Sequence, residues 1–316
     1  MTNHPILKEV RDLICVQLLH HSTYNEKLSE YLLILLHSTE EYKINNFYLY
    51  YMMKLKRYLL IAILSITALL GVILPGATQQ HTLSNTLFQT STISALSVGI
   101  YEGTTNFQEL KKYGDFGLGT VNYLDGEMIG LDGKFYQVKS DGVASIIPDS
   151  MISPFATVTF FKAEKLIHLK GQVNYQELQR SLDQRLPTKN YPYAIRIQGN
   201  FPYLKFRTVP KQTPPYPRLA DAIKRQSVFE LRNVNGTLVG FRTPKYMQGV
   251  NVNGYHFHFI TASRKTGGHI LDGQFQNAKI EVDTISNVQI NLPKNAEFDQ
   301  ADLGDVKPDK VNKIER

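Results

Sequence analysis

The chain has 316 residues, of which 42% are hydrophobic and 20% are charged. This length suggests about two domains, and the apolar fraction is enough for a buried core, which excludes a wholly disordered chain. The formal net charge of +7 is basic, but too small to indicate nucleic acid by itself. Cys15 is the only cysteine, which excludes disulfide scaffolds, iron–sulfur clusters and cysteine zinc fingers. Any metal must therefore be held by histidine, aspartate or glutamate.

A segment with a basic start and an apolar run begins at Met53, deep inside the chain. Residues 53–77 contain three basic residues followed by sixteen consecutive uncharged, mostly apolar residues. This order is typical of a secretory signal peptide. As a helix the apolar run is about 24 Å long, which is shorter than a bilayer core of about 30 Å. The segment therefore predicts a signal peptide, with an uncleaved N-terminal membrane anchor or a buried helix as alternatives.

A signal peptide acts at the start of a chain, so translation is expected to begin at Met53. Residues 1–52 are then an upstream over-extension or a disordered segment, and a short helical subdomain is the alternative. An exported chain without Cys15 contains no thiol, which suits an oxidising exterior. We therefore expect a secreted protein, or a membrane-anchored one if the signal is not cleaved.

Residues 82–292 are predicted to form short strands with few helices. Asn106 is a favourable N-cap for a short helix that stops at Gly114. Apolar residues recur at helical spacing over residues 173–186, and a proline follows directly. A third short helix is expected over 217–226, with a proline near its first turn.

Two segments 110 residues apart, 124–130 and 234–240, resemble each other. Both combine a turn, an apolar run and a glycine. The repeat predicts an α+β fold of two related mixed-sheet lobes, consistent with an internal duplication, although chance similarity is the alternative. The lobes are expected at residues 82–189 and 190–292. The polar residues 293–316 are expected to form a C-terminal tail.

Two further segments have compositions that also occur in nucleotide-binding or nucleic-acid-binding proteins. Residues 114–120 (GDFGLGT) contain three glycines, but no helix is predicted after them, as phosphate binding requires, so a tight turn is expected. Residues 196–225 contain seven basic residues interleaved with aromatic ones, a pattern that also occurs in proteins that bind single-stranded nucleic acid. A strand followed by a solvated helix is the preferred interpretation, and no nucleic-acid partner is expected.

Three of the nine histidines lie within fourteen residues. His256 and His258 alternate with apolar residues in a predicted strand, and His269 begins a second strand after a turn. If the hairpin is centred between Ser263 and Arg264, His258 lies opposite His269 and all three imidazoles project from one face. Cross-strand Cβ distances of about 4.5–5.5 Å would allow the three rings to converge on one metal ion.

Three imidazole ligands would leave a coordination position for water or substrate, which is typical of a catalytic metal site. Zinc is the expected cofactor because imidazole suits it, with copper, nickel and iron as alternatives. The alternative without a metal is a polar sheet face that carries three histidines. Two other charged residues, Glu127 and Arg207, are either solvated charges on strands or functional groups in a pocket. Arg207 shares a predicted strand face with Lys205, and an arginine directed into the cavity would hold a carboxylate.

Taken together, seven segments of the chain resemble the alpha-acetolactate decarboxylase family. The resemblance covers residues 86–316, excludes 1–77, and includes the spacing HxH followed by GGH. It implies two-lobed α+β subunits that form a homodimer. The segments are 88–103, 114–130, 134–142, 153–161, 206–219, 236–246 and 254–272.

The resemblance also implies the site. The family's three zinc-binding histidines match His256, His258 and His269. Its other site residues are an acidic pocket residue, an arginine, a threonine and a glutamate from a C-terminal tail folded over the pocket. In this chain they match, in that order, Glu127, Arg207, Thr120 and Glu315.

The activity that the resemblance implies is the conversion of 2-acetolactate to acetoin and carbon dioxide, a step of acetoin and butanediol biosynthesis. Zinc would act as a Lewis acid that stabilises the enediolate. A zinc-dependent ester or lactone hydrolase is the nearest alternative, because the same ligand set activates water for attack on a carbonyl group. An exported metal-binding module without catalysis is the alternative from another class.

Overall fold

The computed structural model describes residues 54–55, 57–59 and 85–304. The packing of the chain divides it into two units, Met1–Gly76 and Ala77–Arg316. In the first unit the described residues are helical. The second unit holds the two sheets and the candidate site.

Three predictions concern residues that are not described. The expected over-extension at 1–52 lies outside the described residues, and so does most of the expected signal at 53–77. The tail residue Glu315 also lies outside them. Among the residues that are described, no helix has both the length and the apolar character needed to cross a bilayer.

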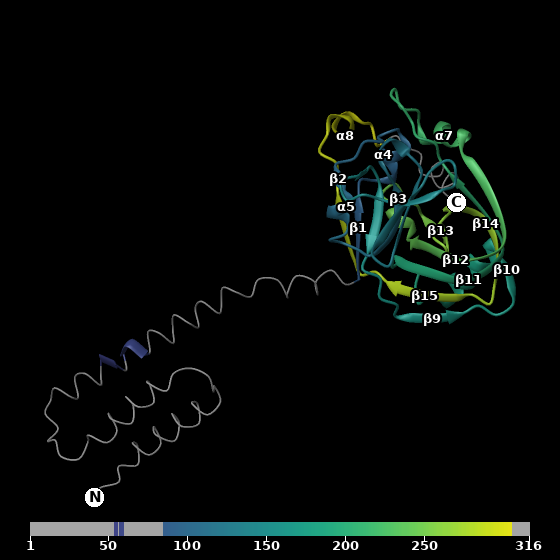
Figure 1. The fold of residues 1–316 in the computed structure, drawn as a ribbon, viewed down its shortest axis with the longest axis horizontal. Helices are drawn as coiled ribbons and strands as arrows, with labels where there is room; N and C mark the ends of the chain where they lie inside the picture. The colour runs from purple at the N-terminus through teal and green to yellow at the C-terminus, as the bar shows by residue number, and fades with distance from the viewer. Residues whose placement is uncertain (1–53, 56, 60–84, 305–316) are drawn as a thin grey trace, which may run out of the picture. The chain divides into compact units, whose positions relative to one another are not determined.

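The first of two β-sheets within residues 85–304 has seven strands in the order β16-β1-β8-β3-β4-β5-β6 (Figure 1). Its strands pair antiparallel except β1 and β16, which are parallel. The sheet is therefore mixed, as predicted. Its strands are β1 (Thr86–Thr90), β3 (Phe116–Thr120), β4 (Glu127–Leu131), β5 (Lys134–Val138), β6 (Ala144–Ile146), β8 (Ala156–Thr159) and β16 (Asn287–Asn291).

The second sheet of this part of the chain also has seven strands, in the order β10-β14-β13-β12-β11-β15-β9, and all pairs are antiparallel. Strand β14 also pairs with β11, so the pairings of β11 to β14 form a closed ring. The strands are β9 (Lys165–His168), β10 (Gln172–Asn174), β11 (Tyr193–Thr208), β12 (Ser227–Thr243), β13 (Gly254–Thr261), β14 (Gly267–Gln276) and β15 (Lys279–Thr284).

Within the described residues, helices are few and short, as the sequence predicted. The second unit also contains a two-stranded sheet of β2 (Thr105–Asn106) and β7 (Ile152–Ser153). The helices are α4 (Ile93–Ser97), α5 (Phe107–Leu110), α6 (Tyr175–Arg185), α7 (Leu219–Ala222) and α8 (Ala296–Gln300), with 3-10 turns η2 (Asn122–Leu124), η3 (Ile223–Arg225) and η4 (Lys245–Met247).

The helix predicted over 173–186 is confirmed as α6, and local chemistry explains its start. The Asn174 side chain accepts a hydrogen bond from the backbone N–H of Glu177, and the Glu177 side chain accepts one from the backbone N–H of Asn174. This reciprocal capping satisfies backbone donors that a helix start leaves without partners. Leu178 and Leu182 are buried and belong to the core of the second sheet.

The two sheets are not two consecutive stretches of the chain. Strands β9 and β10 and helix α6 come before residue 190 but pack with the second sheet. Strand β16 comes after the second sheet and returns to pair with β1. Each sheet therefore contains strands from both of the predicted lobes.

An apolar layer joins the two sheets. Leu118, Ile129 and Val138 from the first sheet share a buried cluster with Val239 and Phe241 from the second. Burial of such side chains contributes about 1.5–3 kcal/mol each relative to exposure. The layer therefore fixes the separation at which residues of β4 and β13 face one another.

The expectation of a tight turn at residues 114–120 is wrong, because most of this segment is strand β3. Its glycines serve close strand packing. A Cβ at Gly117 would lie 2.3 Å from the Thr157 carbonyl oxygen, and a Cβ at Gly119 would lie 2.3 Å from that of Phe155. Both contacts are closer than real Cβ atoms allow, so glycine is required where β3 passes β8.

The two similar segments agree only in part. Residues 127–130 belong to strand β4, and residues 236–240 belong to strand β12. Their first halves differ, because 124–126 form a turn whereas 234–235 continue β12. The internal duplication therefore stays a prediction.

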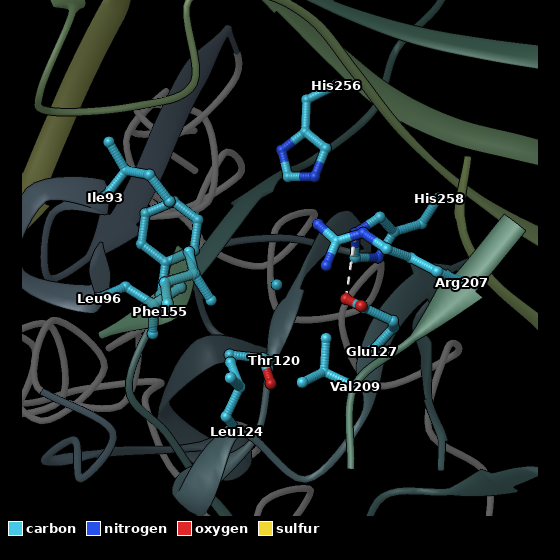
Figure 2. A pocket seen from close by; sticks show the side chains of 12 residues that line it. Ile93, Leu96, Thr120, Leu124, Glu127, Phe155, Arg207, Val209, His256 and His258 are labelled. Carbon is cyan, nitrogen blue, oxygen red and sulfur yellow. Dashed lines mark ion pairs between the residues drawn. The ribbon is translucent and has the colours of Figure 1, made fainter. Parts of the chain in front are cut away.

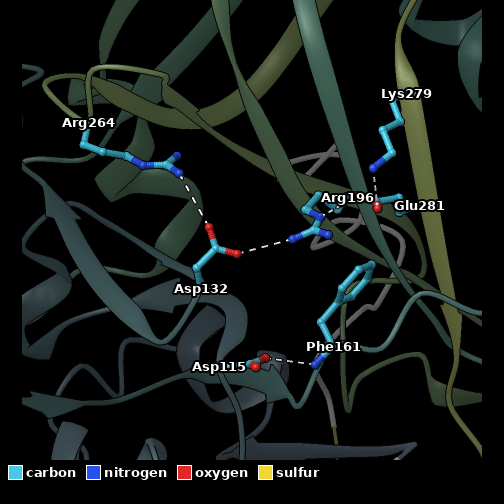
Figure 3. A network of polar contacts seen from close by, with 7 residues as sticks. All are labelled: Asp115, Asp132, Phe161, Arg196, Arg264, Lys279 and Glu281. Carbon is cyan, nitrogen blue, oxygen red and sulfur yellow. Dashed lines mark hydrogen bonds and ion pairs between the residues drawn. The ribbon is translucent and has the colours of Figure 1, made fainter.

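A surface network of charges links the sheets at the end of β4 away from Glu127 (Figure 3). Asp132 follows β4 and lies 3.3 Å from Arg196 of β11 and 3.8 Å from Arg264 of the β13–β14 turn. Arg196 also donates a 2.7 Å hydrogen bond to Glu281. Because Asp132 is well exposed, its two ion pairs contribute little to stability.

Candidate active site

The predicted histidine hairpin is confirmed. Strands β13 and β14 pair with His258 opposite His269, as the expected turn centre requires. His256 lies two residues before His258 on β13, so its side chain points to the same face. The alternation of histidine with Phe257 and Phe259 therefore separates the site face from a buried apolar face.

The three imidazoles form one compact group. A ring nitrogen of each can be chosen so that all lie within 4.8 Å of one another. The ring centroids are 4.9–5.4 Å apart. His256 Nε2 lies 3.1 Å from His269 Nδ1. All three rings are buried, so water contributes little to their environment.

Burial keeps the three imidazoles neutral. It lowers the pKa of His258 to about 3, with the positive charge of Arg207 acting in the same direction. It also lowers the pKa of His256 and of His269 well below the ordinary value. Neutral imidazole is the protonation state that binds a metal ion.

One hydrogen bond fixes the orientation of the His258 ring. Its Nδ1 lies 2.9 Å from the backbone oxygen of Met128 on β4. A carbonyl oxygen only accepts, so Nδ1 carries the proton and the lone pair of the neutral ring is on Nε2. That Nε2 lies 3.5 Å from Oε2 of Glu127. Two electron-rich atoms therefore face each other, an arrangement that a cation or a shared proton would stabilise.

Glu127 enters the site from the first sheet. It begins β4, is buried, and pairs across the ladder with Thr120 of β3. The Thr120 hydroxyl donates a 2.7 Å hydrogen bond to the backbone oxygen of Gly126, the residue before Glu127. Thr120 therefore supports the backbone that presents the carboxylate.

Arg207 enters from β11, where it is only 2% exposed and pairs with His269. Lys205, on the same strand, has a different environment, because its side chain is 40% exposed and lies 3.9 Å from Glu230. Of the two basic residues on this strand, Arg207 is the one in the pocket. A buried guanidinium beside neutral rings is suited to hold an anionic group.

The site residues and a set of apolar side chains line the same pocket, and Ile93, Leu96 and Phe155 lie across it from Arg207 and His258 (Figure 2). The sequence did not single out the apolar wall, because its members come from separate segments without a common spacing. All of its members lie in the segments that resemble the family, but the sequence gives an apolar side chain no chemical feature that marks it as functional. The pocket is lined by Ile93, Leu96, Gly119, Thr120, Leu124, Glu127, Phe155, Arg207, Val209, Leu219, His256 and His258.

The structure thus brings together six of the seven residues predicted for the site. His269 joins the group through His256 and His258. The seventh, Glu315, lies outside the described residues, so its place in the site stays a prediction.

The fold and this pocket define a class, a sheet-rich enzyme with a buried histidine site between two sheets. The family model of alpha-acetolactate decarboxylase matches residues 87–305. That match covers well over half of the chain. The chain therefore belongs to the alpha-acetolactate decarboxylase family, a family of carboxy-lyases.

Relatives from distant organisms share much of the sequence. An alpha-acetolactate decarboxylase of Methanosarcina mazei is 47% identical over 233 residues, which are 74% of this chain and 81% of the relative. One of Brevibacillus brevis is 45% identical over 231 residues, which are 73% of this chain and 81% of the relative.

Solved structures show the same fold. The crystal structure of alpha-acetolactate decarboxylase from Bacillus subtilis strain 168 is similar with a TM-score of 0.71 and 38% identity, covering 72% of this chain and 98% of that one. A Staphylococcus aureus protein of unknown function, described as similar to alpha-acetolactate decarboxylase, has a TM-score of 0.69 and 32% identity. It covers 73% of this chain and 100% of its own.

Proposed function

We propose that this chain decarboxylates 2-acetolactate to acetoin, with zinc bound by His256, His258 and His269. The observation that carries the proposal is the opposition of these buried histidines and Glu127 in a pocket that also holds Arg207. The family relationship supports the same activity.

The residues present fit a zinc ion. They offer three neutral nitrogen donors on paired strands. The hydrogen bond from His258 Nδ1 to the backbone oxygen of Met128 orients this ring and leaves its Nε2 available to the metal. When bound, zinc supplies a Lewis acid that withdraws electron density from substrate oxygens. Imidazole donors also suit copper, nickel and iron, so the choice of zinc is part of the proposal.

The reaction breaks the bond between the carboxylate and C2 of 2-acetolactate. Carbon dioxide leaves, and the electron pair stays on the carbon skeleton as an enediolate, which takes up one proton to give acetoin. Arg207 faces the carboxylate and holds its negative charge through hydrogen bonds from the guanidinium group. The low-dielectric pocket strengthens that interaction.

Glu127 is positioned to deliver the proton that the enediolate takes up. Its carboxylate lies in the pocket at the start of β4, and Thr120 holds the preceding peptide. Delivery of a proton to one face of the planar enediolate would set the configuration of the product. Glu315 is proposed to assist or to close the site from the C-terminal tail.

A zinc-dependent ester or lactone hydrolase remains the second candidate, because the same donor set would activate water. One assay separates the two. Purified protein is incubated with 2-acetolactate, and carbon dioxide and acetoin are measured together. The proposal predicts equal amounts of both. Hydrolysis of simple esters or lactones without release of carbon dioxide would contradict it.

Export and assembly are also proposals. The composition of residues 53–77 supports a secreted or membrane-anchored chain that begins at Met53. The family resemblance supports a homodimer. Peptides from residues 1–52 in mass spectra of the native protein would contradict the start at Met53.

A further inference from the structure

One turn beside the site has an unfavourable backbone. Tyr123 has a φ of 70° and Leu124 has a φ of 54°, so two consecutive residues with side chains lie in the left-handed region. This region is uncommon for residues other than glycine, and bulky side chains make it costly. Such a conformation persists only where the surrounding contacts enforce it.

The contacts around this turn do enforce it. The backbone N–H of Tyr123 donates to the carbonyl of Tyr101 at 2.8 Å, and the carbonyl of Tyr123 accepts from the N–H of Gln212 at 2.7 Å. The N–H of Gly126 donates to the carbonyl of Leu124 at 2.9 Å. The Thr120 hydroxyl then holds the Gly126 carbonyl. Tyr123 is therefore tied to two distant segments of the fold, and the backbone after Leu124 is held by local hydrogen bonds.

The result is that Leu124 projects into the pocket. Its side chain is buried in a cluster with Leu96 and Phe155, and all three line the pocket. Figure 2 shows Ile93, Leu96 and Phe155 across the pocket from Arg207 and His258, with Leu124 below, near Thr120. The pocket is therefore divided into a polar side and an apolar side.

The shape of 2-acetolactate matches this division. Its carboxylate, hydroxyl and keto oxygens are polar, and it carries two methyl groups, one on C2 and one on the keto carbon. If the oxygens face the histidines and Arg207, the methyl groups face the apolar wall. An apolar wall discriminates between alkyl groups by the space that it leaves for them.

We propose that Leu124, held by the strained turn, limits the size of the alkyl group that the pocket accepts on C2 of the substrate. This inference rests on the proposed decarboxylase activity. It assigns to the left-handed backbone the role of placing one apolar side chain against the substrate. Leu124 is thus a specificity-determining residue and takes no part in the bond-breaking step.

The test compares two substrates in each enzyme. They are 2-acetolactate, with a methyl group on C2, and 2-aceto-2-hydroxybutyrate, with an ethyl group there. The readout is the ratio of kcat/KM for the ethyl substrate to kcat/KM for the methyl substrate. Because removal of the leucine side chain makes room for the extra methylene, Leu124→Ala should raise this ratio about tenfold. An unchanged ratio would overturn the proposal.

Two further variants keep the test decisive. Leu124→Gly removes the whole side chain and adopts the left-handed backbone without strain, so it should shift the ratio in the same direction. Leu131→Ala is the matched control, because Leu131 is buried at the other end of β4 and does not line the pocket. Its ratio should equal that of the unmodified protein.

The ratio is internal to each sample, so partial unfolding does not alter it. If Leu131→Ala shifted the ratio as much as Leu124→Ala, the effect would come from general loosening, and the proposal would fail. If the unmodified protein turned over neither substrate, the proposed function itself would fail. Turnover of both substrates with ratios equal in all variants would overturn only the role of Leu124.

Discussion

At the scale of single residues, the site depends on the opposition of His258 and Glu127. The two side chains come from different sheets and meet at 3.5 Å. The backbone oxygen of Met128, the neighbour of Glu127, also accepts the Nδ1 proton of His258. Strand β4 therefore provides both the carboxylate and the group that orients one proposed metal ligand.

Glu127→Gln separates the proton role of this residue from metal binding. Glutamine keeps the shape of the side chain but cannot deliver a proton as a carboxylic acid does. Turnover of 2-acetolactate should fall by about 10²–10⁴-fold, the usual contribution of a general acid or base. Metal content, measured on the same sample, should stay unchanged. Undiminished acetoin production would remove Glu127 from the proton transfer.

At the scale of elements, the close approach of β14 to β11 places His269 beside Arg207. Gly268 makes this approach feasible. It has a φ of 150°, and a Cβ there would lie 2.4 Å from the backbone oxygen of Arg207. Backbone atoms cannot yield as the end of a flexible side chain does, so any larger residue must separate the two strands.

Gly268→Ala is therefore expected to reduce metal content and turnover together, and to lower stability by roughly 1–3 kcal/mol because of overpacking. Gly199→Ala is the control on β11, where a Cβ would make only ordinary contacts of 3.4–3.5 Å. Metal analysis and thermal unfolding of both variants test the expectation. Normal metal content in Gly268→Ala would show that the strands tolerate the added carbon.

Strand β15 contains a buried carboxylate whose contribution to folding stability depends on pH. Asp283 accepts one hydrogen bond, from the backbone N–H of Lys162 at 2.9 Å, and among the described residues its other oxygen has no partner. Burial raises the pKa of Asp283 from 3.8 to about 6. The folded chain therefore holds this proton more tightly than the unfolded chain does.

This raised pKa determines how the contribution of Asp283 to stability changes with pH. Below about pH 4 the carboxyl is protonated in both states, and its contribution to stability is fully present. That contribution is lost as pH rises through about 6, with a magnitude of about 3 kcal/mol. Asp283→Asn should remove this loss, so stability near pH 7 should increase relative to the unmodified protein.

Denaturant unfolding at pH 4, 5, 6 and 7 measures the effect of Asp283→Asn. Glu230→Gln is the control, because Glu230 is an exposed carboxylate on β12. Its effect on stability should stay within about 0.5 kcal/mol at every pH. A pH profile for Asp283→Asn that is parallel to that of the unmodified protein would contradict the expectation.

The sequence predicted those elements that local rules determine. Alternation and a turn were enough to place His258 opposite His269, and the helical spacing of apolar residues with the proline after them located α6. The strand at residues 114–120 was missed because its glycines resemble turn residues when their neighbours are unknown. Only the position of β8 shows that they make space for a backbone. The apolar wall was missed for a similar reason, since only the fold brings its segments together.

At the scale of the whole molecule, the two sheets exchange strands, so neither sheet is formed by one continuous stretch of the chain. Strand β16 returns from the end of the second sheet to pair with β1. Strands β9 and β10 extend the second sheet from earlier in the chain. Sequence periodicity carries no information about such pairings between distant segments. The chain that follows β16 includes α8 and leads towards the predicted tail residue Glu315.

The predicted role of the tail is open to a direct test. Deletion of residues 311–316 should reduce turnover without changing the melting temperature, because the sheets and their core lie within residues 85–304. Glu315→Gln should reproduce most of the loss if the carboxylate is the active group. A rate equal to that of the full chain in both variants would make Glu315 an ordinary tail residue.

Decarboxylation is expected to depend on a metal ion that the three imidazoles hold. The most direct measurement strips the protein with a chelator and adds zinc back in steps, while bound metal and acetoin formation are followed in the same sample. Activity should rise in proportion to bound zinc and level off at one ion per chain. In the His258→Ala variant both should be lost. Full activity in a metal-free sample, or in a His258→Ala variant without metal, would show that the reaction does not need the proposed metal site.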